Sequence, residues 1–160
     1  IVHYYKGEYD KALGYYGRSL TIFEEIGDKR GMGLSLNNIG LVHASKGDYN
    51  KAAEHLEKSL AIQKEIGFKG LELFTTTYLY LSYKHLGKDY DVKEIHSLIK
   101  DAEDIEFEVN FRLYQLLEET SYLETAYKQV QENVSAMDDG KKYLSYPIPK
   151  AIVEEWEKVK

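Results

Sequence analysis

The chain has 160 residues, a formal net charge of −6 and no cysteine. This length is enough for one domain or a short repeat array with a sizeable core. Without cysteine the chain has no disulfide framework, thiolate nucleophile or thiolate metal site, which suits a reducing compartment. The acidic balance argues against nucleic-acid binding, and no apolar run is long enough to cross a membrane. We therefore expect a cytoplasmic protein that binds neither nucleic acid nor membrane.

A sequence repeat organises the first part of the chain. The run Lys6–Ala12 (KGEYDKA) recurs as Lys46–Ala52 (KGDYNKA), and Glu25–Gly27 recurs as Glu65–Gly67. Each second copy lies 40 positions after the first, as Lys46 does after Lys6. A fixed period of this size is typical of helical repeat arrays. Residues 1–7 align with residues 41–47, so we expect the chain to begin in the second half of a helix, as a fragment of a longer protein.

Three helices are predicted in chain order, over Glu8–Ile26, Met32–Ser45 and Tyr49–Ile66, because their apolar residues recur at intervals of three and four. Gly27 suits the left-handed position that ends a helix, and Asp28–Gly31 is expected to be a loop. Gly40 lies in mid-helix, where glycine costs roughly 1 kcal/mol relative to alanine. Its presence indicates that a neighbouring helix approaches closely, opposite the small residues Ala52 and Ser59.

The order of small and large residues resembles the tetratricopeptide repeat. The positions that carry the resemblance are Ile39, Gly40, His43, Gly47, Tyr49, Ala52, Leu56 and Ser59. His43 departs from the family's usual Tyr. The period is longer than the family's common length of about 34 residues. It is similar to the longer variant of kinesin light chains, spindle-orientation adaptors and many prokaryotic arrays.

The resemblance covers Val2–Gly67. It implies an all-α fold, a right-handed superhelix of about three to four helical hairpins ending in a capping helix. After Gly67 the pattern weakens, and further helices are predicted over Leu71–Leu86, Tyr90–Asp104, Phe107–Glu118 and Ser121–Met137.

The expected domain organisation follows from this decay of the repeat. Pro147 and Pro149 bias the residues before them away from the helix, which predicts an extended segment before the final amphipathic helix. The expected parts are the second half of a truncated helix (1–7), well-formed repeats (8–67), degenerate repeats (68–138), an extended Pro-containing linker (139–149) and a capping helix (150–160).

The sequence shows no arrangement of residues that indicates catalysis. His3 and His43 recur with the repeat, which favours structural packing over metal ligation. Adjacent carboxylates such as Glu24 and Glu25 point about 100° apart on a helix and do not form a two-carboxylate site. The segment Gly27–Gly31 follows a helix and lacks the spacing of a phosphate-binding loop. We therefore expect no enzymatic activity, no cofactor and no metal.

The resemblance implies that the first helix of each hairpin lines a concave groove. Asn38 stands where several family members carry an Asn that holds the backbone of a peptide ligand, because a carboxamide offers both a donor and an acceptor. Phe74 and Tyr78 replace the cations of members that clamp a C-terminal carboxylate. The groove residues implied by the repeat register are Leu34, Asn37, Asn38, Leu41, Ser45, Phe74, Thr77, Tyr78, Leu81 and His85.

These positions favour a non-catalytic, monomeric scaffold that binds a protein or peptide segment with apolar anchors. Two structural alternatives stay open for individual residues: Asn37 and Asn38 could bond neighbouring loops, and Phe74 and Tyr78 could belong to the core between repeats. Two functional alternatives also stay open. The chain could be the regulatory segment of a signalling enzyme, such as a nucleotide cyclase or kinase, with its catalytic domain upstream. It could also be an assembly module that dimerises through its terminal helix.

Overall fold

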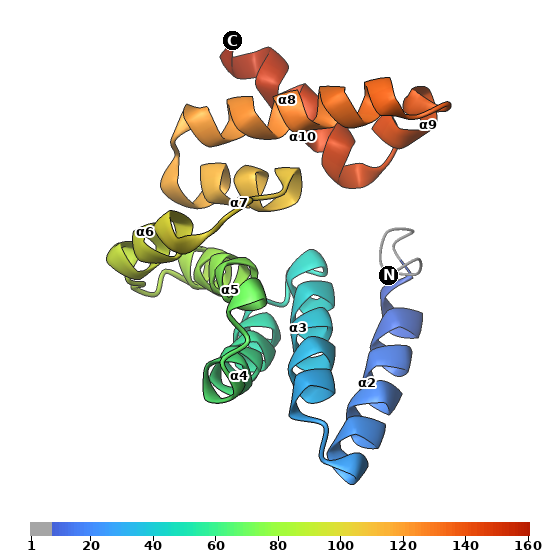
Figure 1. Cartoon of the computed structure of the whole chain (residues 1–160), viewed down its shortest axis with the longest axis vertical. Helices are drawn as coiled ribbons and strands as arrows, with labels where there is room; N and C mark the ends of the chain where they lie inside the picture. The colour runs from blue at the N-terminus through green and yellow to red at the C-terminus, as the bar shows by residue number, and fades with distance from the viewer. Residues whose placement is uncertain (1–7) are drawn as a thin grey trace. The chain divides into compact units, whose positions relative to one another are not determined.

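A computed structural model describes residues 8–160 (Figure 1). Every regular element in this range is a helix, which confirms the all-α fold class. The truncated helix predicted over residues 1–7, including His3, lies outside the described residues. The chain divides into two compact units, one that reaches to Ala102 and one that runs from Glu103 to Lys160.

The first unit is a helical repeat in which each helix packs on the next. In addition α5 contacts α3, so the first helices of two successive hairpins touch each other. A helical repeat array requires both kinds of contact, between consecutive helices and between successive hairpins. The elements are α2 (Tyr9–Ile26), α3 (Lys29–Ser45), α4 (Tyr49–Ile66), the short 3-10 turn η1 (Lys69–Leu71), α5 (Glu72–Leu86) and α6 (Val92–Asp101).

Glycines end three of these helices in the left-handed conformation. Gly27 follows α2 with a φ of 72°, and Gly67 and Gly87 follow α4 and α5, each with a φ of 67°. This conformation lets the glycine N–H bond to carbonyl groups of the last turn, which would otherwise lack partners. The left-handed ending predicted for Gly27 is confirmed.

The start of α3 differs from the expectation. Its first residue is Lys29 rather than Met32, so the loop expected over Asp28–Gly31 is reduced to Asp28. The cause is a side-chain cap, because the Asp28 carboxylate accepts a hydrogen bond of 3.0 Å from the Gly31 backbone N–H. Asp48 caps α4 in the same way by accepting from the Lys51 N–H at 3.3 Å.

Gly40 marks the close helix crossing that its sequence position predicts. A Cβ atom at this residue would lie 2.6 Å from Leu56 Cγ and 3.2 Å from the carbonyl oxygen of Ala52. Ala52, Leu56 and Ser59 are all fully buried. The absence of a side chain at Gly40 is therefore what allows α3 and α4 to pack at this separation.

The second unit contains α7 (Phe107–Leu117), α8 (Thr120–Ala136), α9 (Gly140–Leu144) and α10 (Pro147–Val159). The extended linker expected over residues 139–149 is wrong. Asp139 accepts a hydrogen bond from the Lys142 backbone N–H at 3.2 Å and so starts α9. Pro147 fits the first turn of α10, where no N–H donor is needed. Only Ser145 and Tyr146 separate the two helices.

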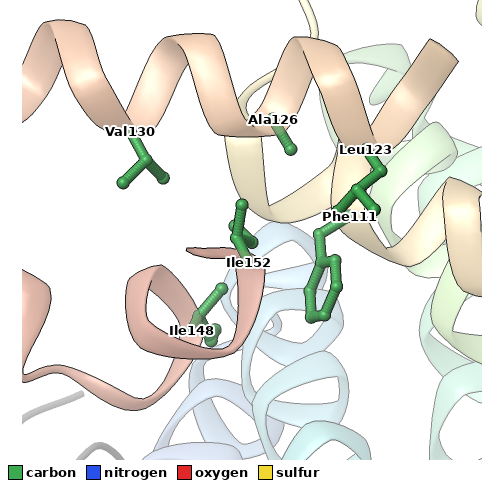
Figure 2. Packing of buried hydrophobic residues seen from close by; sticks show 6 residues of the cluster. All are labelled: Phe111, Leu123, Ala126, Val130, Ile148 and Ile152. Carbon is green, nitrogen blue, oxygen red and sulfur yellow. The ribbon is translucent and has the colours of Figure 1, made fainter. Parts of the chain in front are cut away.

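Helix α10 completes the hydrophobic core of the second unit (Figure 2). Its side chains Ile148 and Ile152 face α8, and Phe111 of α7 packs in the same cluster. Trp156 stacks on Tyr127 of α8 with ring centroids 5.5 Å apart. The cluster consists of Phe111, Leu123, Ala126, Val130, Ile148 and Ile152.

Candidate functional site

The structure brings the two helices that carry the expected groove residues into contact. Helix α3 carries positions 34, 38, 41 and 45, and α5 carries positions 74, 78, 81 and 85. Steps of three and four residues keep each set on one side of its helix. Because α3 contacts α5, the two sets belong to neighbouring helices of the same unit. We call this set of eight residues the α3–α5 face.

The α3–α5 face has an exposed part and a buried part. Leu34, Ser45 and His85 are exposed, and Asn38 and Phe74 are half-buried. Leu41, Tyr78 and Leu81 are buried, as are the two further groove candidates Asn37 and Thr77. Only the first five residues therefore offer surface to a ligand in this conformation.

The two neighbouring asparagines of α3 have different surroundings. Asn37 is 3% exposed, and its Oδ1 accepts a hydrogen bond of 2.9 Å from the Thr75 hydroxyl of α5. Asn38 is half-buried, and its carboxamide makes no hydrogen bond within the described residues. Asn37 thus serves the contact between helices, whereas Asn38 keeps both its donor and its acceptor capacity.

Aromatic rings supply most of the remaining chemistry near this face. Phe74 lies against Tyr78 with ring centroids 4.9 Å apart. His85 stacks on Tyr49 of α4 with ring centroids 4.0 Å apart and ring planes 2° from parallel. None of the eight positions is Asp, Glu, Lys or Arg. The face is therefore apolar and aromatic, with amide, hydroxyl and imidazole groups as its polar part.

A comparison with known protein families finds a match for the first part of the chain. Residues 1–65 match the model of the tetratricopeptide repeat. This part of the chain is similar to the tetratricopeptide repeat family. The matched range includes α2, α3 and almost all of α4, and the consecutive packing of helices continues beyond it through α5 and α6. A comparison with curated proteins finds no match.

The hairpin α3–α4 contains two histidines, His43 and His55, of which the repeat predicts a structural role for His43. The His43 and His55 rings stack with centroids 5.4 Å apart. Burial, and next the charge that His55 can carry, lower the pKa of His43. Within residues 8–160 no three His, Cys, Asp or Glu side chains are placed to hold a metal ion. In the same range no helix has both the length and the apolarity to cross a membrane.

A buried polar group between the hairpin α3–α4 and α5 was not predicted from the sequence. Gln63 of α4 is 1% exposed and bonds to Ser59 and to Thr75, which are both fully buried. The available signal was the position of Gln63, which continues the three-and-four spacing of Leu56 and Leu60 on the buried side of α4. A polar residue on a buried helix face needs internal partners.

Proposed function

We propose that this protein is a non-catalytic module that binds a protein or peptide segment on the α3–α5 face. Tetratricopeptide repeats generally mediate interactions between proteins, and the family is typically non-catalytic. The finer assignment, which gives the binding role to one surface of this chain, is our proposal. It rests on the side chains of α3 and α5 rather than on the family match.

The single observation that carries the proposal is the state of Asn38. The residue is half-buried, and its carboxamide has no hydrogen-bond partner within the described residues. Neither amide atom of Asn38 is among the buried polar atoms without a partner, so the group is accessible and can exchange water for a ligand. The backbone of an extended peptide offers one N–H and one C=O per residue, which matches the two functions of a carboxamide.

The surroundings of Asn38 favour apolar side chains in the ligand. Leu34 is 38% exposed one turn before Asn38 on α3, and Phe74 is half-buried on α5. Aromatic and large aliphatic surfaces of this kind dominate the energy of many interfaces. The face carries no Lys or Arg, so a terminal carboxylate would find no lysine or arginine partner among its eight residues. We therefore propose an internal peptide segment with apolar anchors.

A peptide-display selection on the purified chain tests this function. We expect one sequence family to enrich, with apolar or aromatic residues at fixed spacing and no requirement for a free C-terminus. The same peptides synthesised with an amidated C-terminus should bind equally well, because the face has no Lys or Arg to bind a carboxylate. Failure to enrich any family, or enrichment that depends on the terminal carboxylate, contradicts the proposal.

A further inference from the structure

A buried hydrogen-bond network joins α3, α4 and α5. Gln63 of α4 donates from Nε2 to Ser59 Oγ at 2.9 Å and to Thr75 Oγ1 at 2.8 Å. Ser59 then donates to the backbone carbonyl of Gly33 at 2.7 Å, and Thr75 donates to Asn37 Oδ1 at 2.9 Å. None of the four side chains is more than 3% exposed.

The direction of these hydrogen bonds follows from the protons available. A hydroxyl group has one proton, which Ser59 gives to Gly33 and Thr75 gives to Asn37. Both hydroxyl oxygens must therefore act as acceptors toward Gln63, and the amide nitrogen with its two protons serves both. Gln63 is thus the origin of two routes, one through α4 and one through α5, and both routes end on α3.

The network is not the arrangement that stability alone would favour. The Oε1 atom of Gln63 is buried and has no partner within the described residues, which is unfavourable for a polar atom. One period earlier the same helix position is Phe23, whose ring packs against Gly31. An apolar residue is therefore compatible with this position of the repeat. A polar residue here needs a reason other than burial energy.

Directional bonding supplies that reason. The hydrophobic effect is non-directional, whereas a hydrogen bond weakens steeply away from its ideal geometry. We propose that the network of Gln63, Ser59, Thr75 and Asn37 is a register device that fixes how α5 seats against the hairpin α3–α4. It thereby holds α3 and α5, with Asn38 and Phe74, at one relative position.

A matched pair of substitutions in α5 tests the register device. Thr75 and Thr76 are adjacent and both fully buried, but the Thr76 hydroxyl has no partner within the described residues. Valine has nearly the shape of threonine without the hydroxyl. Thr75→Val therefore interrupts the route from Gln63 to Asn37, whereas Thr76→Val removes only an unpaired group. Thr75→Ser restores the hydroxyl.

The distance between α3 and α5 is the readout that a merely stabilising role would not change. The chain has no cysteine, so Leu34→Cys and His85→Cys place two spin labels without competing sites, and the same labels are present in every variant. We expect one narrow distance distribution in the parent chain, in Thr76→Val and in Thr75→Ser. We expect a broadened or split distribution in Thr75→Val. A distribution in Thr75→Val that equals the parent's overturns the proposal.

A second variant covers the case in which Thr75→Val does not fold. Replacing the network as a whole, with Asn37→Leu, Ser59→Ala, Gln63→Met and Thr75→Val, leaves no network side chain with an unpaired polar atom. We expect this chain to fold and to show a broadened distribution of α3–α5 distances. A narrow parent-like distribution overturns the proposal.

The register device does not depend on the proposed function, but its effect on ligand binding does. Binding is measured on the same variants without the two label cysteines, because Leu34 and His85 belong to the α3–α5 face. If the distances broaden and a selected peptide still binds with unchanged affinity, the register device stands and the assignment of the binding surface to the α3–α5 face fails. If the distances broaden and affinity falls in the same variants, both are supported.

Discussion

His43 combines burial with a neighbourhood that disfavours its protonation. Its side chain is 12% exposed, and its Nδ1 atom is buried without a hydrogen-bond partner within the described residues. Burial, followed by the charge of His55, lowers the pKa of His43. The Asp48 carboxylate, 3.9 Å from Nδ1, acts in the opposite direction but does not prevail, and Lys46 and Lys51 add to the lowering.

This lowered pKa predicts a loss of stability in mild acid. The unfolded chain protonates His43 near the ordinary pKa of about 6.5, before the folded chain does. The contribution of neutral His43 to the free energy of unfolding is therefore fully present above about pH 6.5, and it is lost as the pH falls through the lower pKa of the folded state. We expect the thermal unfolding midpoint to decrease as the pH is lowered from about 7 to about 5. In His43→Tyr we expect the midpoint to depend less on pH over this range.

The carboxylates titrate at lower pH than His43, so the stability change that they cause in acid serves as an internal control. The Tyr80 hydroxyl and the Lys64 ammonium hold the pKa of Glu94 below its usual value, so its contribution is lost only at more acidic pH. Both His43→Tyr and the parent chain should keep that acidic transition. An identical slope for the two chains between pH 7 and pH 5 contradicts the role given to His43.

Single residues also show where the sequence stops being informative. The pattern treats Asn37 and Asn38 alike, because both lie on α3 and both are asparagine. Neighbouring residues on a helix point about 100° apart, so only one of them can reach Thr75 of α5. The repeat register could place both residues on the correct helix. Which of the two bonds to α5 and which stays at the surface depends on the position of α5.

The helix crossings were predictable because glycine and alanine within a helix indicate where a second helix approaches closely. Gly40 lies over Ala52 and Leu56 as its position in the repeat indicates. Helix boundaries were less accessible, because they depend on side-chain caps that the apolar spacing does not show. Asp28 and Asp139 each turn an expected non-helical segment into a first helical turn by accepting a backbone N–H.

Two glycines in neighbouring helices should respond oppositely to the same substitution. Gly40→Ala places a Cβ atom 2.6 Å from Leu56 Cγ and 3.2 Å from a backbone oxygen of α4. We expect a loss of roughly 1–3 kcal/mol in the free energy of unfolding, because overpacking outweighs the better helix propensity of alanine.

Gly14 is the matched control for this substitution. It also lies inside a helix, but a Cβ atom there would meet nothing within 4 Å among the described residues. Gly14→Ala should raise the free energy of unfolding by roughly 0.5–1 kcal/mol, since only the backbone term remains. Chemical denaturation of the two variants measures both effects. Equal effects of the same sign would contradict the close crossing of α3 and α4.

For the whole molecule, the 40-residue period was the strongest signal, because it repeats both the loops and the buried positions. It led to the all-α repeat and to the family that residues 1–65 match. The division into two compact units at Ala102 and Glu103 was not foreseen. Sequence similarity to the repeat fades in this region, and the end of α6 at Asp101 depends on the extended backbone of Ala102 rather than on a glycine or proline.

The most direct test of the binding role is the dissociation constant of one selected peptide for two asparagine variants. Asn38→Ala removes the unpaired amide of the α3–α5 face, whereas Asn50→Ala changes an exposed asparagine of α4. We predict that Asn38→Ala weakens binding about tenfold or more, equivalent to roughly 1.4 kcal/mol, and that Asn50→Ala leaves the affinity unchanged. Equal affinities of Asn38→Ala and the parent chain would contradict binding at this face.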